Sequence, residues 1–67
     1  MRNWVREPFN GGCDYIEEYT GTLVTGYYDS PKFEADCSCW VASNVPDMAF
    51  DTVDAAIDAA NAANAAN

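Results

Sequence analysis

The sequence contains no histidine, and only three of its 67 residues are basic: Arg2, Arg6 and Lys32. Histidine is the commonest general acid or base near neutral pH, and a nucleophilic cysteine needs a basic or cationic neighbour. Binding to DNA or RNA depends on lysine and arginine, which neutralise phosphates. These shortages argue against an enzyme and against direct nucleic-acid binding, and we expect a protein that needs no cofactor.

Long apolar runs are also missing. No stretch of about 18 apolar residues is present, so the sequence predicts no membrane-spanning helix. The first eight residues lack the apolar segment of a signal peptide. We therefore expect a cytoplasmic protein.

Cysteine is sparse and odd in number, with Cys13, Cys37 and Cys39. An odd count without a secretion signal does not indicate a disulfide framework, and structural zinc usually takes four Cys or His ligands. The aspartates of residues 47–54 lack the glycine and the closing glutamate of a calcium-binding loop. We expect no metal and three reduced cysteines in the core; a cross-link from Cys13 to Cys37 or Cys39 is the alternative.

Apolar and aromatic residues are plentiful. They make up 49% and 13% of the chain, which is too much for an intrinsically disordered protein and enough for one small core. We assign residues 1–64 to a single domain. The chain ends in three Ala-Ala-Asn repeats without a large apolar side chain, so we expect residues 65–67 to be a frayed tail.

Residues 33–42 alternate between apolar and other side chains, which is the pattern of a half-buried strand. The even positions, which include Glu34, Asp36 and Trp40, would face solvent. The apolar odd positions would face the core; they are Phe33, Ala35, Cys37, Cys39 and Val41.

A second strand precedes this one. Residues 15–28 are rich in β-branched and aromatic side chains, and we interpret them as one long strand with a bend or bulge at Gly21. Residues 29–32 have the Asp, Ser and Pro of a turn. The pattern predicts an antiparallel hairpin between residues 19–28 and 33–42.

A second turn signal lies at Asn10-Gly11-Gly12. It would connect the long strand to a short first strand over residues 3–7, which Pro8 ends. The expected sheet is therefore a three-stranded antiparallel meander.

The C-terminal part of the chain predicts a helix. Residues 44–47 are expected to form a loop, and Asp51 is a suitable N-cap for a helix over residues 52–64. A stripe of small apolar residues recurs at helical spacing: Val53, Ala56, Ile57 and Ala60. The expected fold class is α+β, with this helix packed on one face of the three-stranded sheet.

Acidic residues dominate the charge: there are eleven, and the net charge is −8. One interpretation is that the acidic residues only keep the chain soluble and monomeric. The other is that rows of carboxylates bind arginines and lysines of a basic protein surface that otherwise holds phosphates. The rows would be Asp51, Asp54 and Asp58 on one helix flank and Glu34 and Asp36 on the hairpin, with Glu17 and Asp47 as outer members and Trp40 as an aromatic anchor. Alternatively, Trp40 packs under the helix or against Trp4.

These features resemble the small acidic anti-CRISPR proteins that phages and mobile elements encode, several of which mimic DNA. The resemblance rests on chain length, on the excess of acids in residues 14–58, on the missing catalytic residues and on the hairpin-plus-helix plan. It implies a monomeric, non-enzymatic inhibitor in the host cytoplasm. Such a protein would block target-DNA or PAM recognition by a type I CRISPR effector.

A fainter resemblance covers residues 33–61. This strand followed by VPDMAFDTVDAAIDAAN is similar to the strand–loop–helix of HicB-like antitoxins and other small β-β-α modules. It implies an alternative function as an antitoxin or as a general acidic protein-interaction module.

Overall fold

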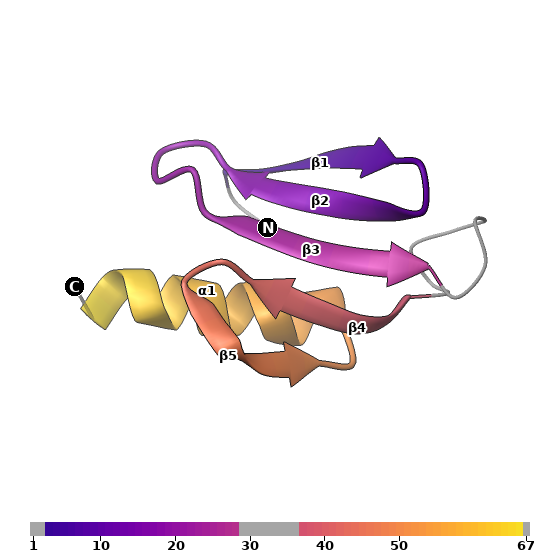
Figure 1. The fold of residues 1–67 in the computed structure, drawn as a ribbon. Helices are drawn as coiled ribbons and strands as arrows, with labels where there is room; N and C mark the ends of the chain where they lie inside the picture. The colour runs from indigo at the N-terminus through magenta and orange to yellow at the C-terminus, as the bar shows by residue number, and fades with distance from the viewer. Residues whose placement is uncertain (1–2, 29–36, 67) are drawn as a thin grey trace.

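The computed structural model describes residues 3–28 and 37–66. Within them one antiparallel sheet has its five strands in chain order, and a C-terminal helix follows (Figure 1). The α+β class and the C-terminal helix are confirmed, whereas the prediction of three strands is wrong. The elements are β1 (Trp4–Phe9), β2 (Gly12–Glu17), β3 (Leu23–Tyr28), β4 (Cys37–Ala42), β5 (Val45–Phe50) and α1 (Val53–Ala66).

The first strand is longer than predicted, because β1 continues through Pro8 to Phe9. Strand β1 is at the edge of the sheet, where a residue without an N–H group can be accommodated. The turn after it is confirmed. Phe9 pairs with Gly12, and Gly11 has a φ of 101°, a conformation that glycine adopts without strain.

The single long strand predicted over residues 15–28 is wrong, because a turn divides it into β2 and β3. Gly21 has a φ of 74° and donates its N–H to the carbonyl oxygen of Glu17 at 2.8 Å. Glu17 in turn donates its N–H to the carbonyl oxygen of Thr22 at 2.9 Å. Gly21 therefore belongs to a tight turn and not to a bulge.

The loop predicted at residues 44–47 is largely strand. Strand β5 begins at Val45, directly after a tight turn, and Ala42 pairs with Val45. Pro46 suggested a loop, but β5 is the other edge of the sheet, where proline is again accommodated. The hairpin of β3 and β4 is confirmed, and its connection lies outside the described residues.

The buried face of β4 is the opposite of the predicted one over its described side chains. Trp40 is only 2% exposed and Ala42 is fully buried, whereas Cys39 is exposed. The Trp40 ring covers Gly26, and it meets Tyr15 edge-on with ring centroids 5.9 Å apart. Burying a tryptophan removes far more apolar surface from water than burying a cysteine, so the indole takes the core side.

The two cysteines whose side chains the structure describes, Cys13 and Cys39, lie on opposite faces of the sheet. Cys13 is fully buried, as expected, but Cys39 is an exposed free thiol, so the expectation of a core position is wrong for Cys39. A Cys13–Cys39 cross-link is not formed. The side chain of Cys37 lies outside the described residues, and so does the alternative that involves it.

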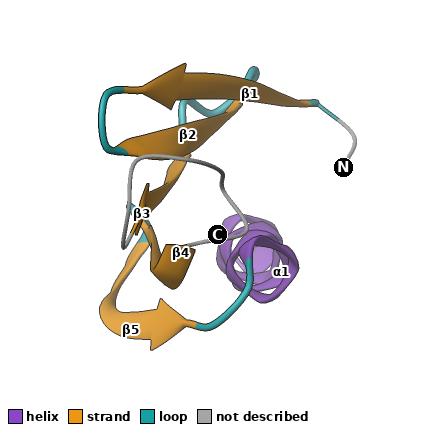
Figure 2. Cartoon of the chain, turned by 90° about the vertical axis from the view of Figure 1, so that its right-hand side faces the viewer, coloured by secondary structure: helices purple, strands orange, loops and turns teal. Residues whose placement is uncertain are grey.

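Helix α1 covers one face of the sheet and packs mainly against β3, β4 and β5 (Figure 2). Its buried residues are Ala56, Ile57 and Ala60, and they join Trp4, Tyr15, Val24 and Trp40 in one core cluster. Small side chains on the buried stripe let the helix approach the sheet closely.

The ends of α1 differ from the prediction. Thr52 and not Asp51 is the N-cap, because its Oγ1 accepts the N–H of Ala55 at 3.2 Å. The helix also reaches Ala66, two residues beyond the predicted end.

Two asparagines of the C-terminal repeat attach this last part of the helix to the sheet. The Nδ2 group of Asn64 donates to Oγ1 of Thr22 at 3.2 Å, and its Oδ1 accepts from Nδ2 of Asn44 at 3.1 Å. Oδ1 of Asn61 accepts the indole N–H of Trp4 at 3.3 Å. The repeat has no large apolar side chain to bury, so these hydrogen bonds attach it to the rest of the fold.

We predict that Gly26→Ala destabilises the fold, since the added Cβ would lie 2.6 Å from the Trp40 ring. We expect the free energy of unfolding to fall by about 1–3 kcal/mol, the usual cost of overpacking a core. Gly21→Asn is the control, because that position is open and asparagine tolerates a positive φ. Urea denaturation measures both variants; equal stability of Gly26→Ala and wild type would contradict the packing.

Candidate functional site

A hollow of about 710 Å³ lies between α1 and the β2–β3 turn. We call it the helix-flank groove. Its described lining contains three carboxylates and no basic residue. Its polar lining side chains include Tyr19 and the five residues Glu17, Asp54, Asp58, Asn61 and Asn64.

Two of the predicted contact residues, Asp54 and Asp58 on α1, are exposed and line this groove. They are four residues apart on α1, so their Cβ atoms lie about 5–6 Å from each other. Asp54 is in the first helical turn, where the helix dipole favours a negative charge, whereas Asp58 is one turn further in. Asp51 is exposed just before the N-cap and does not line the groove.

Glu17 lines the groove too, but its carboxylate is committed to the fold. The side chain is 6% exposed, and its two oxygens accept the backbone N–H groups of Tyr19 at 3.0 Å and Thr20 at 2.9 Å. The hydrogen bond from Tyr19 is the main cause that lowers the pKa of Glu17 below its ordinary value. In the structure Glu17 stabilises the β2–β3 turn, and both of its carboxylate oxygens already accept hydrogen bonds within the fold.

The other predicted contact residues are dispersed. Asp47 is exposed on β5 and is not part of the groove lining. Trp40 is buried in the core, so its predicted place on the contact surface is wrong. Glu34 and Asp36 lie outside the described residues.

The charge of the described ranges is strongly one-sided: they contain eight acidic residues and one basic residue, Arg6. Such an imbalance gives a negative field that attracts cations and basic proteins.

Among the described residues no three Asp, Glu, Cys or His side chains are grouped to hold a metal ion. The described helix is also too short and polar to cross a membrane. The groove suits an ammonium or guanidinium group that pairs with exposed carboxylates.

Asn61 and Asn64 are groove residues that the sequence interpretation did not identify. Their signal is the spacing of the repeat, because residues three apart lie on the same side of a helix. The carboxamides project from the side of α1 that faces Trp4 and Thr22. The two residues fix the position of the helix that carries Asp54 and Asp58.

No protein-family model matches the chain, and neither a curated protein nor a solved structure shows significant similarity to it.

The lowered pKa of Glu17 predicts a pH-dependent stability. A carboxyl group whose pKa is lower in the folded state stabilises the fold above its unfolded-state pKa, ordinarily 4.5, and loses this contribution as the pH falls through the lowered value. We expect wild type to be more stable than Glu17→Gln at pH 7, and this difference to shrink toward pH 3.

Urea denaturation of both proteins across this pH range measures the effect. Glu18→Gln is the matched control, since Glu18 is exposed and adjacent in sequence. A constant difference between wild type and Glu17→Gln at all pH values would show that the Glu17 carboxylate is not selectively stabilised in its charged form.

Proposed function

We propose that this protein is a non-enzymatic inhibitor that binds the basic, phosphate-holding surface of a nucleic-acid-binding protein. The contact surface is the helix-flank groove with Asp54 and Asp58, together with the exposed Asp51 just before the helix. The observation that carries the proposal is that Asp54 and Asp58 are exposed side by side along a groove whose described lining has no basic residue. Their charges are therefore available to the lysines and arginines of a partner.

Electrostatics supports this mode of binding. Charge-assisted hydrogen bonds between carboxylates and guanidinium groups are about twice as strong as neutral ones. A net charge of −8 also speeds the approach to a basic surface, and this effect weakens as salt screens it. The inhibitor needs neither a nucleophile nor a bound metal, since it acts by occupying the surface that DNA would use.

The particular form that we propose is an anti-CRISPR protein that blocks target-DNA or PAM recognition by a type I effector. Small size, a large excess of acids and the absence of histidine support it. In this form Asp54 and Asp58 compete with DNA phosphates for the same basic side chains. Excess target DNA should therefore displace the inhibitor.

We predict that Asp54→Asn combined with Asp58→Asn weakens inhibition. The assay is binding of a labelled target duplex to purified type I effectors of several subtypes, at increasing concentrations of the inhibitor. We expect wild type to block DNA binding to at least one effector, and the double variant to need a roughly 10- to 100-fold higher concentration, about one decade or less for each lost charge pair.

The matched control is Glu18→Lys, which changes the net charge by the same two units on an exposed residue outside the groove lining. Its inhibition should stay near that of wild type. If the double variant and Glu18→Lys lost inhibition equally, the loss would be due to the overall charge and not to the two aspartates of the groove. Failure of wild type against every effector would reject the anti-CRISPR assignment.

A further inference from the structure

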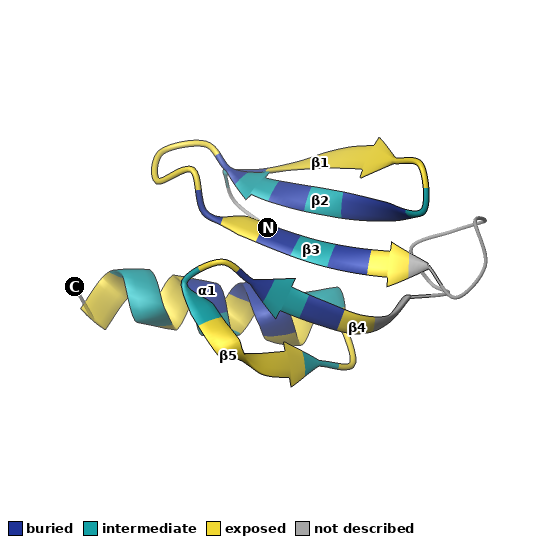
Figure 3. Ribbon diagram, in the orientation of Figure 1, coloured by how far each residue is buried: buried dark blue, intermediate teal, exposed yellow. Residues whose placement is uncertain are grey.

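The face of β1–β3 that points away from α1 is a second exposed surface, which we call the open sheet face. Burial alternates along β2 and β3 in Figure 3: Tyr15 and Val24 are buried on the α1 side, and their neighbours lie on the other side. Strand pairing arranges this other side in three rows across the strands. Each row runs from β1 to β3, and the β1 members of the three rows are Val5, Glu7 and Phe9.

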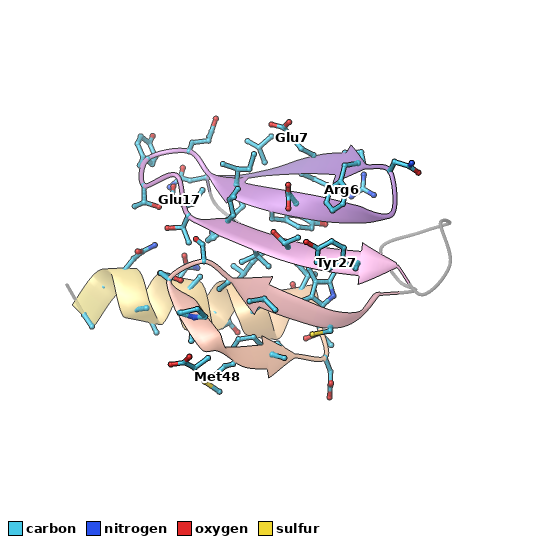
Figure 4. All side chains as sticks on the ribbon, viewed as in Figure 1. Arg6, Glu7, Glu17, Tyr27 and Met48 are labelled. Carbon is cyan, nitrogen blue, oxygen red and sulfur yellow. The ribbon has the colours of Figure 1, made fainter. Side chains whose placement is uncertain are left out.

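The two outer rows are apolar. Val5 pairs with Ile16 and Ile16 pairs with Leu23, which gives an aliphatic row whose outer members, Val5 and Leu23, are 41% and 36% exposed. The other row contains Phe9 and Tyr27. Their rings meet edge-on above Gly12, with the ring centroids 5.8 Å apart. Tyr27 is 63% exposed, and tyrosine is a frequent anchor of protein interfaces (Figure 4).

The middle row is acidic. Glu7 on β1 lies directly opposite Asp14 on β2, which lies opposite Thr25 on β3. Oγ1 of Thr25 donates to Oδ1 of Asp14 at 2.7 Å and so holds that carboxylate in place. Like charges directly opposite each other destabilise a sheet, and no basic residue of β1–β3 lies on this face. The fold thus tolerates, between two apolar rows, a pair of like charges that no basic residue of β1–β3 balances on this face.

We infer that the open sheet face binds a cationic amphipathic helix of another protein. A lysine or arginine of that helix would lie between Glu7 and Asp14, and large apolar side chains one turn before and after it would cover the two outer rows. The rows are about 6.7 Å apart, twice the rise per residue of a strand. A helix that follows the strands offers side chains about every 5.4 Å, which long side chains can match.

Charge complementarity selects this occupant. A second copy of the chain would bring Glu7 and Asp14 toward the same two carboxylates and would add another net charge of −8. A basic helix instead neutralises the pair and covers the exposed aromatic and aliphatic side chains. The surface is separate from the helix-flank groove, because α1 lies on the opposite side of the sheet (Figure 2). The inference therefore does not depend on the proposed function.

The test uses a synthetic helical peptide with one central lysine and leucines three and four residues on either side of it. Titration into the isotope-labelled full chain, followed by amide NMR shifts, should locate binding at β1–β3. Glu7→Gln combined with Asp14→Asn should weaken binding about tenfold or more. It should also leave stability equal or higher, because like-charge repulsion is relieved while the carboxamide oxygen introduced at position 14 can still accept from Thr25.

Two controls make the result specific. Asp47→Lys changes the net charge by the same two units at an exposed residue of β5, outside both the open sheet face and the helix-flank groove, and it should leave the affinity for the peptide within about threefold. A peptide with glutamate in place of the central lysine should not bind. Absence of binding, shifts centred on α1, or concentration-dependent shifts of β1–β3 without peptide would each overturn the inference, the last in favour of a second copy.

Discussion

The contact between Trp40 and Gly26 determines which side of the sheet is the core. The indole needs the space that a side chain at position 26 would fill, and in that position it also meets Tyr15. Once Trp40 points toward α1, Ala42 must do so as well, and Cys39 is turned to the exposed face. The same choice places Val24 under the helix and leaves Thr25 and Tyr27 outside.

One helix of 14 residues then has to shield this core, and it lies mainly along three of the five strands. Its buried stripe consists largely of alanine, which brings the helix close to the sheet but contributes little apolar area. Hydrogen bonds compensate by fixing the far end of α1: Asn61 accepts from Trp4, and Asn64 accepts from Asn44 and donates to Thr22. The position of Asp54 and Asp58 beside the β2–β3 turn follows from this attachment.

The fold class, the helix and the hairpin of β3 and β4 follow from the sequence, because period-two and helical patterns and turn residues signal them locally. The number of strands does not. The Glu17 carboxylate and Gly21 build a turn inside a run that has continuous β propensity, and Pro46 suggests a loop until the strand is known to be an edge. The alternation in residues 39–42 is compatible with either face, and only the fit of the Trp40 ring on Gly26 decides between them.

The carboxylates of this chain differ in what the fold offers them. Glu17 receives two backbone N–H groups, Asp14 receives the hydroxyl of Thr25, and Asp54 lies at the positive end of the helix dipole. Glu7 faces another carboxylate, and Asp58 follows Asp54 on the same flank, with no basic residue in the described part of the groove lining. A partner that supplies positive charge gains most where the fold supplies least, since it relieves repulsion as well as forming a new contact. For the two partners that we propose, Glu7 and Asp58 are therefore the residues at which binding would gain the most free energy, and they lie on opposite sides of the sheet.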